Sequence, residues 1–91
     1  MPNAAEYRTA AHRYRMLGED YLRQASLVAG SRVDSHLGAG PVAVAVADAL
    51  RSVASHLTIA SGEMARLAGI CDTRAVVCDE YARLVEEMRA A

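Results

Sequence analysis

Residues 46–88 read VADALRSVASHLTIASGEMARLAGICDTRAVVCDEYARLVEEM. Apolar residues recur along this stretch at alternating steps of four and three, which places them on one side of an α-helix, whereas a strand would alternate every second residue. The stripe consists of Val46, Leu50, Val53, Leu57, Ala60, Met64, Leu67, Cys71, Arg74, Cys78, Tyr81, Val85 and Met88. Arg74 is its only charged member. The stretch therefore predicts a long helix with an apolar seam that its own chain is too short to bury throughout.

A shorter helix is expected to precede it, over residues 4–29. Asn3 suits the N-cap, Glu6 stands in the capping-box position, and Gly30 is expected to end the helix in a left-handed conformation. Tyrosines alternate with small residues along its seam, which is Tyr7, Ala11, Tyr14, Gly18, Tyr21, Ala25 and Val28. A tyrosine stripe can stack on a ligand, but the heptad spacing favours packing against a second helix.

The opposite face of this shorter helix carries Arg8, Arg15, Glu19 and Arg23. Arg15 and Glu19, and likewise Glu19 and Arg23, are i,i+4 neighbours that stabilise a helix by only a few tenths of a kcal/mol. We therefore expect a solvated polar face there.

The connection between the helices contains Gly38, Gly40 and Pro41, and Pro41 suits the first turn of the second helix. That helix is expected over residues 41–89, about 70 Å long against about 40 Å for the first. One alternative is a fold-back near residues 69–73 that makes a third helix. The stripe keeps its phase through Gly62 and Gly69, which favours one long helix, bent at most.

The fold expected for residues 1–91 is a single all-α domain, an antiparallel two-helix hairpin. A row of small residues beside the stripe would receive the tyrosines of the first helix, namely Ala47, Ala54, Ser61, Ala68 and Ala75. The hairpin would then bury one seam within itself and present another outward. Dimerisation into a four-helix bundle would cover the second seam.

Composition excludes several classes of function. The chain has 91 residues and a net charge of −1, and all ten basic residues are arginines interspersed with acidic ones, so we expect no nucleic-acid partner. No uninterrupted apolar run approaches the length of about 20 residues that spans a membrane, and the first residues do not resemble a signal peptide. Neither a transmembrane segment nor a cleaved leader is therefore expected.

No catalytic, metal or cofactor site is predicted. Cys71 and Cys78 are seven residues apart on one helix, about 10 Å, which is too far for a disulfide between them. We expect two reduced thiols, with a disulfide between two chains as the alternative. His12, His36 and His56 make no helical ligand pair. No serine stands in a nucleophile motif, so we expect a non-enzymatic protein.

Two short motifs and the overall plan resemble the small helical-hairpin proteins of type VII secretion, the W-x-G or ESAT-six-like superfamily with its EspC-like members. The turn reads His36-Leu37-Gly38, where that superfamily carries Trp-x-Gly. Near the C-terminal end, Tyr81 is followed by Val85, Glu86 and Glu87, where the superfamily's export signal has an acidic residue four positions after tyrosine. The chain keeps the glycine and the tyrosine, replaces tryptophan by histidine, and shifts the acid by one position.

The resemblance implies a secreted substrate or secretion partner that pairs with itself or with a sibling hairpin. Tyr81 and Glu86 would be the export signal, and His36, Gly38, Gly40 and Pro41 the hairpin turn. The protein would be cytoplasmic before export and secreted or envelope-associated afterwards. The packing and partner seam would use Tyr7, Tyr14, Tyr21, Leu50, Leu57, Met64, Leu67 and Val85. The alternatives are that Tyr81 is simply a seam residue, and that the protein is a cytoplasmic adaptor or immunity-type bundle that is never exported.

Overall fold

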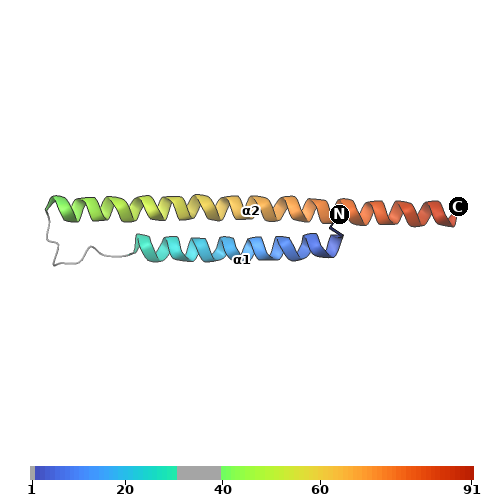
Figure 1. Cartoon of the computed structure of the whole chain (residues 1–91), viewed down its shortest axis with the longest axis horizontal. Helices are drawn as coiled ribbons and strands as arrows, with labels where there is room; N and C mark the ends of the chain where they lie inside the picture. Colours follow the sequence, from blue (N-terminus) through green and yellow to red (C-terminus); the bar gives the residue numbers. More distant parts are fainter. Residues whose placement is uncertain (1, 31–39) are drawn as a thin grey trace.

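Two antiparallel helices form an extended hairpin (Figure 1). The computed structural model describes residues 2–30 and 40–91; His36 and Gly38 of the expected turn lie outside these residues. Helix α1 spans Ala4–Ala29 and helix α2 spans Pro41–Ala90, and the molecule measures 78 × 16 × 14 Å. No strand occurs in the described residues. The expected all-α hairpin is therefore confirmed.

Both ends of α1 lie where the sequence predicts them. The Asn3 side chain accepts a hydrogen bond from the backbone N–H of Glu6 at 2.9 Å, which satisfies one of the free donors at the helix start. The expectation of a left-handed Gly30 is wrong, because this residue has φ −82° and ψ −6°. Its N–H still donates to the carbonyl of Ser26 at 2.9 Å, so the last turn closes with right-handed geometry.

Helix α2 is unbroken, which excludes the alternative of a third helix. It begins at Pro41, with Gly40 at the N-cap, and ends at Ala90, one residue beyond the expected end. It continues through Gly62 and Gly69, and Figure 1 shows no fold-back. The hydroxyl of Thr73 donates to the carbonyl of Gly69 at 3.1 Å, so a polar side chain covers the backbone beside that glycine.

Small residues bring the two helix backbones close together. The buried residues are Ala11, Gly18 and Ala25 on α1 and Ala43, Ala68 and Ala75 on α2. Ser61 donates its hydroxyl to the carbonyl of Gly18 at 2.8 Å across the interface. The predicted row of small residues on α2 therefore lies against α1, and the tyrosines of α1 are half-buried beside it.

Helix α2, with 50 residues, extends past both ends of the 26-residue α1 (Figure 1). At the C-terminal side, Cys78 Sγ lies 4.0 Å from the carbonyl oxygen of Pro2, close to where α1 begins. Residues 80–90 continue beyond that point, and we call them the projecting tail. The sequence predicted that α2 is longer than α1, and the structure accommodates the difference because the C-terminal end of α2 projects beyond α1.

Candidate interaction surface

One flank of the hairpin is polar and joins the two helices. Arg8 pairs with Asp79, and Arg15 pairs with Asp72. Within each helix the two partners are seven residues apart, so both pairs lie along one side of the interface. The expectation that Arg8 and Arg15 point away from α2 is therefore wrong, since antiparallel pairing brings Asp72 and Asp79 within their reach.

The Arg15–Asp72 pair changes the acid–base properties of both groups. The hydrogen bond from Arg15 holds the pKa of the Asp72 carboxyl below its ordinary value, although desolvation acts in the opposite direction. The same hydrogen bond raises the pKa of Arg15. The sequence signal for this pairing was the repeat of arginine at 8 and 15 and of aspartate at 72 and 79.

The interface between α1 and α2 buries no large side chain. The buried apolar residues are all alanines, and no large side chain in the described residues is fully buried. Apolar side chains beside the interface stay half-buried, among them Leu50, Leu57 and Met64. A hairpin with so thin a core gains stability from covering further apolar surface.

A second apolar seam runs along α2 on the side away from the polar flank. We call it the outer seam; it consists of Val42, Val46, Ala49, Val53, His56, Ala60, Glu63, Leu67, Ile70, Arg74, Val77, Tyr81, Leu84 and Met88. These residues follow steps of four and three along almost the whole helix. Seven of the large apolar side chains that the hairpin leaves exposed belong to it, namely Val42, Val53, Ile70, Val77, Tyr81, Leu84 and Met88.

The outer seam borders the tyrosine row of α1. The guanidinium carbon of Arg74 lies 6.0 Å from the centre of the Tyr7 ring, within reach of a cation–π interaction. Arg74 thus has a specific neighbour, whereas from the sequence it appeared only as an interruption of the stripe. The predicted stripe divides in the structure: Leu50, Leu57 and Met64 are half-buried, whereas Val53 and Tyr81 are exposed in the outer seam.

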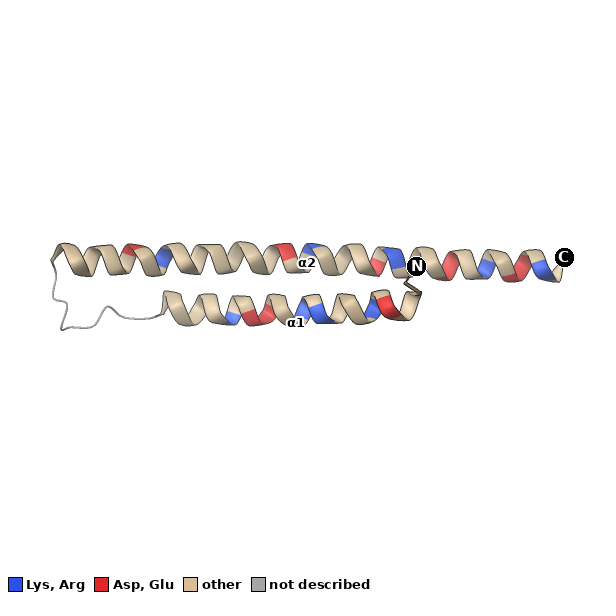
Figure 2. Ribbon diagram, viewed as in Figure 1, with Lys and Arg blue, Asp and Glu red and all other residues tan. Residues whose placement is uncertain are grey.

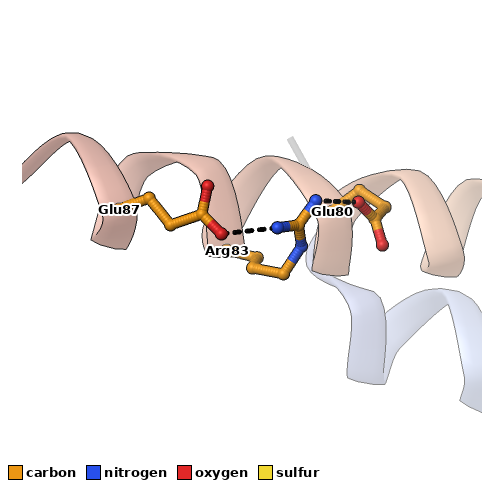
Figure 3. A network of polar contacts seen from close by, with 3 residues as sticks. All are labelled: Glu80, Arg83 and Glu87. Atoms are coloured by element: carbon orange, nitrogen blue, oxygen red, sulfur yellow. Dashed lines mark hydrogen bonds and ion pairs between the residues drawn. The ribbon is translucent and has the colours of Figure 1, made fainter.

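The projecting tail carries the residues predicted as an export signal. Tyr81 is 70% exposed, Glu86 is exposed and Val85 is half-buried. Arg83 bridges Glu80 at 2.8 Å and Glu87 at 2.5 Å on the same helix (Figure 3). These pairs support the helical conformation of a segment that α1 does not cover.

The other predicted site residues are spread along the hairpin. Gly40 and Pro41 begin α2 at the end opposite the tail, so these two residues and Tyr81 are separated by most of the length of α2 (Figure 1). Tyr7, Tyr14 and Tyr21 are half-buried on α1, and Leu67 is half-buried on α2. The structure does not bring the turn of one chain next to its own tail.

Comparison of the chain with protein-family models, with curated proteins and with solved structures finds no match.

The described residues offer no assembled chemical site. In residues 2–30 and 40–91, no three His, Cys, Asp or Glu side chains gather as a metal site would require. Cys71 and Cys78 are free and half-buried. A hollow beside Asn3, Thr9 and Tyr14 is lined by residues of the N-terminal half of α1 and the residue before it, and it is open to solvent. The main feature of the described residues is an extended apolar surface that the hairpin leaves exposed.

Helix α2 also meets the length and composition of a membrane span, alone among the helices described. Its most apolar window of 18 residues has a mean hydropathy of 1.4 and is 11% buried in the hairpin. No uninterrupted apolar run of this length exists, but the charged residues of α2 are spaced so widely that its mean hydropathy stays high (Figure 2). Length and composition of this kind also occur in helices of soluble bundles, so this feature alone does not identify a membrane protein.

Proposed function

We propose that this chain is a non-enzymatic helical-hairpin interaction protein of type VII (ESX-like) secretion. It acts as a secreted substrate or as a secretion partner, and it pairs with itself or with a sibling hairpin to complete a four-helix bundle. One observation carries the pairing: α1 and α2 bury only small residues between them and leave most of the outer seam of α2 exposed.

The shape of the hairpin supports this proposal. Two helices that bury only alanine and glycine fully leave most of their large apolar side chains accessible, and an apolar surface of this extent favours association. A second hairpin offers helices of the same length, so it can cover most of the outer seam.

The projecting tail supports the link to secretion. In the superfamily that the chain resembles, the export machinery reads a tyrosine and an acidic residue near the end of the second helix. Tyr81 and Glu86 are both exposed on a helical segment that α1 leaves free. A receptor can therefore reach both side chains in the single hairpin, and Glu86, which lies outside the outer seam, also when the seam is covered.

Export from a type VII-competent producer tests the role of the tail. We expect Tyr81→Ala and removal of residues 81–91 to abolish the appearance of the protein outside the cell, while its level inside stays unchanged. Ile59→Ala is the matched control, because Ile59 is similarly exposed at 63% on the same helix but lies outside both the outer seam and the tail. This variant should be exported like the wild type.

Failure of the wild-type chain to be exported would contradict the secretion role. If the wild-type chain stays inside a producer that exports other hairpins, the secretion role is wrong and the cytoplasmic adaptor or immunity-type bundle replaces it. Fractionation of the same cells separates this outcome from membrane insertion of α2. Recovery in the membrane fraction after an alkaline wash would contradict both roles.

A further inference from the structure

The outer seam contains one acidic and one basic residue, Glu63 and Arg74. Both side chains are accessible: the Glu63 side chain is 52% exposed and pairs with Arg66 on its own helix at 2.8 Å, and Arg74 is exposed beside Tyr7. A partner helix that covers the seam removes water from both side chains, and it leaves Glu63 with Arg66 alone and Arg74 with the Tyr7 ring alone unless the partner supplies the opposite charges. Burying an unpaired charge is costly, so these two residues select the partner and its register.

We propose that the occupant of the outer seam is a second copy of this chain, with the two α2 helices antiparallel and Glu63 of each copy paired with Arg74 of the other. This proposal rests on the proposed function only in that the hairpin associates with a partner. It further specifies that the partner is a second copy, that α2 packs against α2, and that Glu63 aligns with Arg74. A two-fold axis between the helices forms the ion pair twice, as an isologous interface requires.

This register fits the remaining side chains of the seam. In an antiparallel pair, residues of the two alternating rows face each other in layers. Leu67 then faces Ile70 of the second copy, Ala60 faces Val77, Val53 faces Leu84, Ala49 faces Met88, and His56 faces Tyr81. Two small alanines lie opposite larger side chains, and the polar side chains of His56 and Tyr81 meet each other.

Neighbouring registers do not fit. A shift by one heptad in one direction places Glu63 against Leu67 of the second copy, and a shift in the other direction places Arg74 against Ile70. Each shift buries charges against apolar side chains twice per dimer. The same two charges disfavour a lipid surface as the occupant, because a lipid chain offers them no partner.

The outer seam lies to one side of the face that packs on α1. Covering it with a second α2 therefore leaves α1 in place and builds a four-helix arrangement. The polar flank with Arg15–Asp72 and Arg8–Asp79 stays at the surface on the opposite side. The proposed dimer thus requires no rearrangement of the hairpin.

Charge reversal tests the register in the full-length chain. Glu63→Arg makes two Arg–Arg contacts per homodimer and Arg74→Glu makes two Glu–Glu contacts, so each variant alone should self-associate at least roughly 100-fold more weakly than the wild type. An equimolar mixture of the two variants makes only Arg–Glu contacts. We expect light scattering after gel filtration to show monomers for each variant and a heterodimer for the mixture.

Control variants separate this effect from general charge changes. Glu80→Arg and Arg83→Glu alter charges on α2 outside the outer seam and should leave the dimer intact. Circular dichroism of each variant checks that the helices persist, since Arg74→Glu also removes the contact with Tyr7. The mixture provides its own control for folding, because misfolded variants would not recover association.

Each outcome decides between the two proposals. A wild-type monomer at high concentration that binds a sibling hairpin overturns the second copy as occupant and leaves the proposed function standing. A dimer that both charge reversals leave intact overturns the register. Loss of export in a chain that dimerises as described overturns the secretion role and leaves the dimer standing.

Discussion

At the scale of single residues, Gly18 decides how closely the helices approach. A Cβ atom at this position would lie 3.2 Å from Met64 Cβ and 3.3 Å from the carbonyl oxygen of Ser61. These distances are shorter than ordinary van der Waals contacts, and the Ser61 backbone belongs to a helix that cannot easily move. The hydrogen bond from the Ser61 hydroxyl to the carbonyl of Gly18 depends on the same approach.

We expect Gly18→Leu to destabilise the hairpin by about 1–3 kcal/mol, because the added side chain overpacks the interface. The same substitution at Gly62 should instead stabilise it by up to about 1 kcal/mol, since nothing lies within 4 Å of a Cβ there and leucine favours the helix. Urea denaturation followed by circular dichroism measures both. Equal stabilisation at the two positions would contradict the contact between α1 and α2 at Gly18.

At the scale of the helices, two ion pairs fix how α1 lies along α2. Arg8–Asp79 and Arg15–Asp72 repeat at the heptad spacing, so a shift of α1 by one turn would break both. Exposed ion pairs contribute little free energy individually. Their value here lies in selecting one alignment among those that the small, similar residues of the interface allow.

The pairing of Asp72 with Arg15 predicts a pH dependence of stability. The pKa of Asp72 is lower in the folded chain than in the unfolded one, so its contribution is present above the ordinary aspartate pKa and is lost as the pH falls through the folded value. The difference in melting temperature between wild type and Asp72→Asn should therefore shrink from pH 7 toward pH 2. In an Arg15→Ala background the difference should be small at every pH, and a difference that persists at pH 2 would contradict this origin.

At the scale of the whole molecule, the hairpin is a rod with a radius of gyration of 21.6 Å for its Cα atoms. Such a rod has a large surface for its mass, and α2 extends past α1 at both of its ends (Figure 1). Association side by side covers the outer seam. Association end to end would leave it exposed.

The proposed dimer predicts a specific change in shape. Pairing Glu63 with Arg74 offsets the two copies of α2 by about six residues, or about 9 Å at 1.5 Å per residue. We expect X-ray scattering over a concentration series to show a doubling of mass while the longest dimension grows only slightly beyond that of the hairpin, 78 Å. A dimer with nearly twice that length would contradict side-by-side packing.

The sequence predicted the helices because their signals are local. The 4-3 spacing, Asn3 at the start of α1 and Pro41 at the start of α2 act within one or two turns, and the structure confirms them. The 4-3 spacing of the apolar stripe continues without a shift across Gly62 and Gly69, and this predicted that α2 is continuous. Gly30 was predicted incorrectly, because a glycine can close a helix with either hand and neighbouring residues do not decide between them.

The candidate surface required the tertiary structure. The sequence listed Leu50, Val53, Leu57 and Tyr81 as one stripe, and only packing against α1 separates the residues that are covered from those that remain exposed. The same packing pairs Arg15 with Asp72 and places Arg74 over Tyr7. The sequence by itself thus determined the helices and their apolar faces, whereas the alignment of α1 on α2 decided which face stays open, because burial and charge pairing depend on residues far apart in the chain.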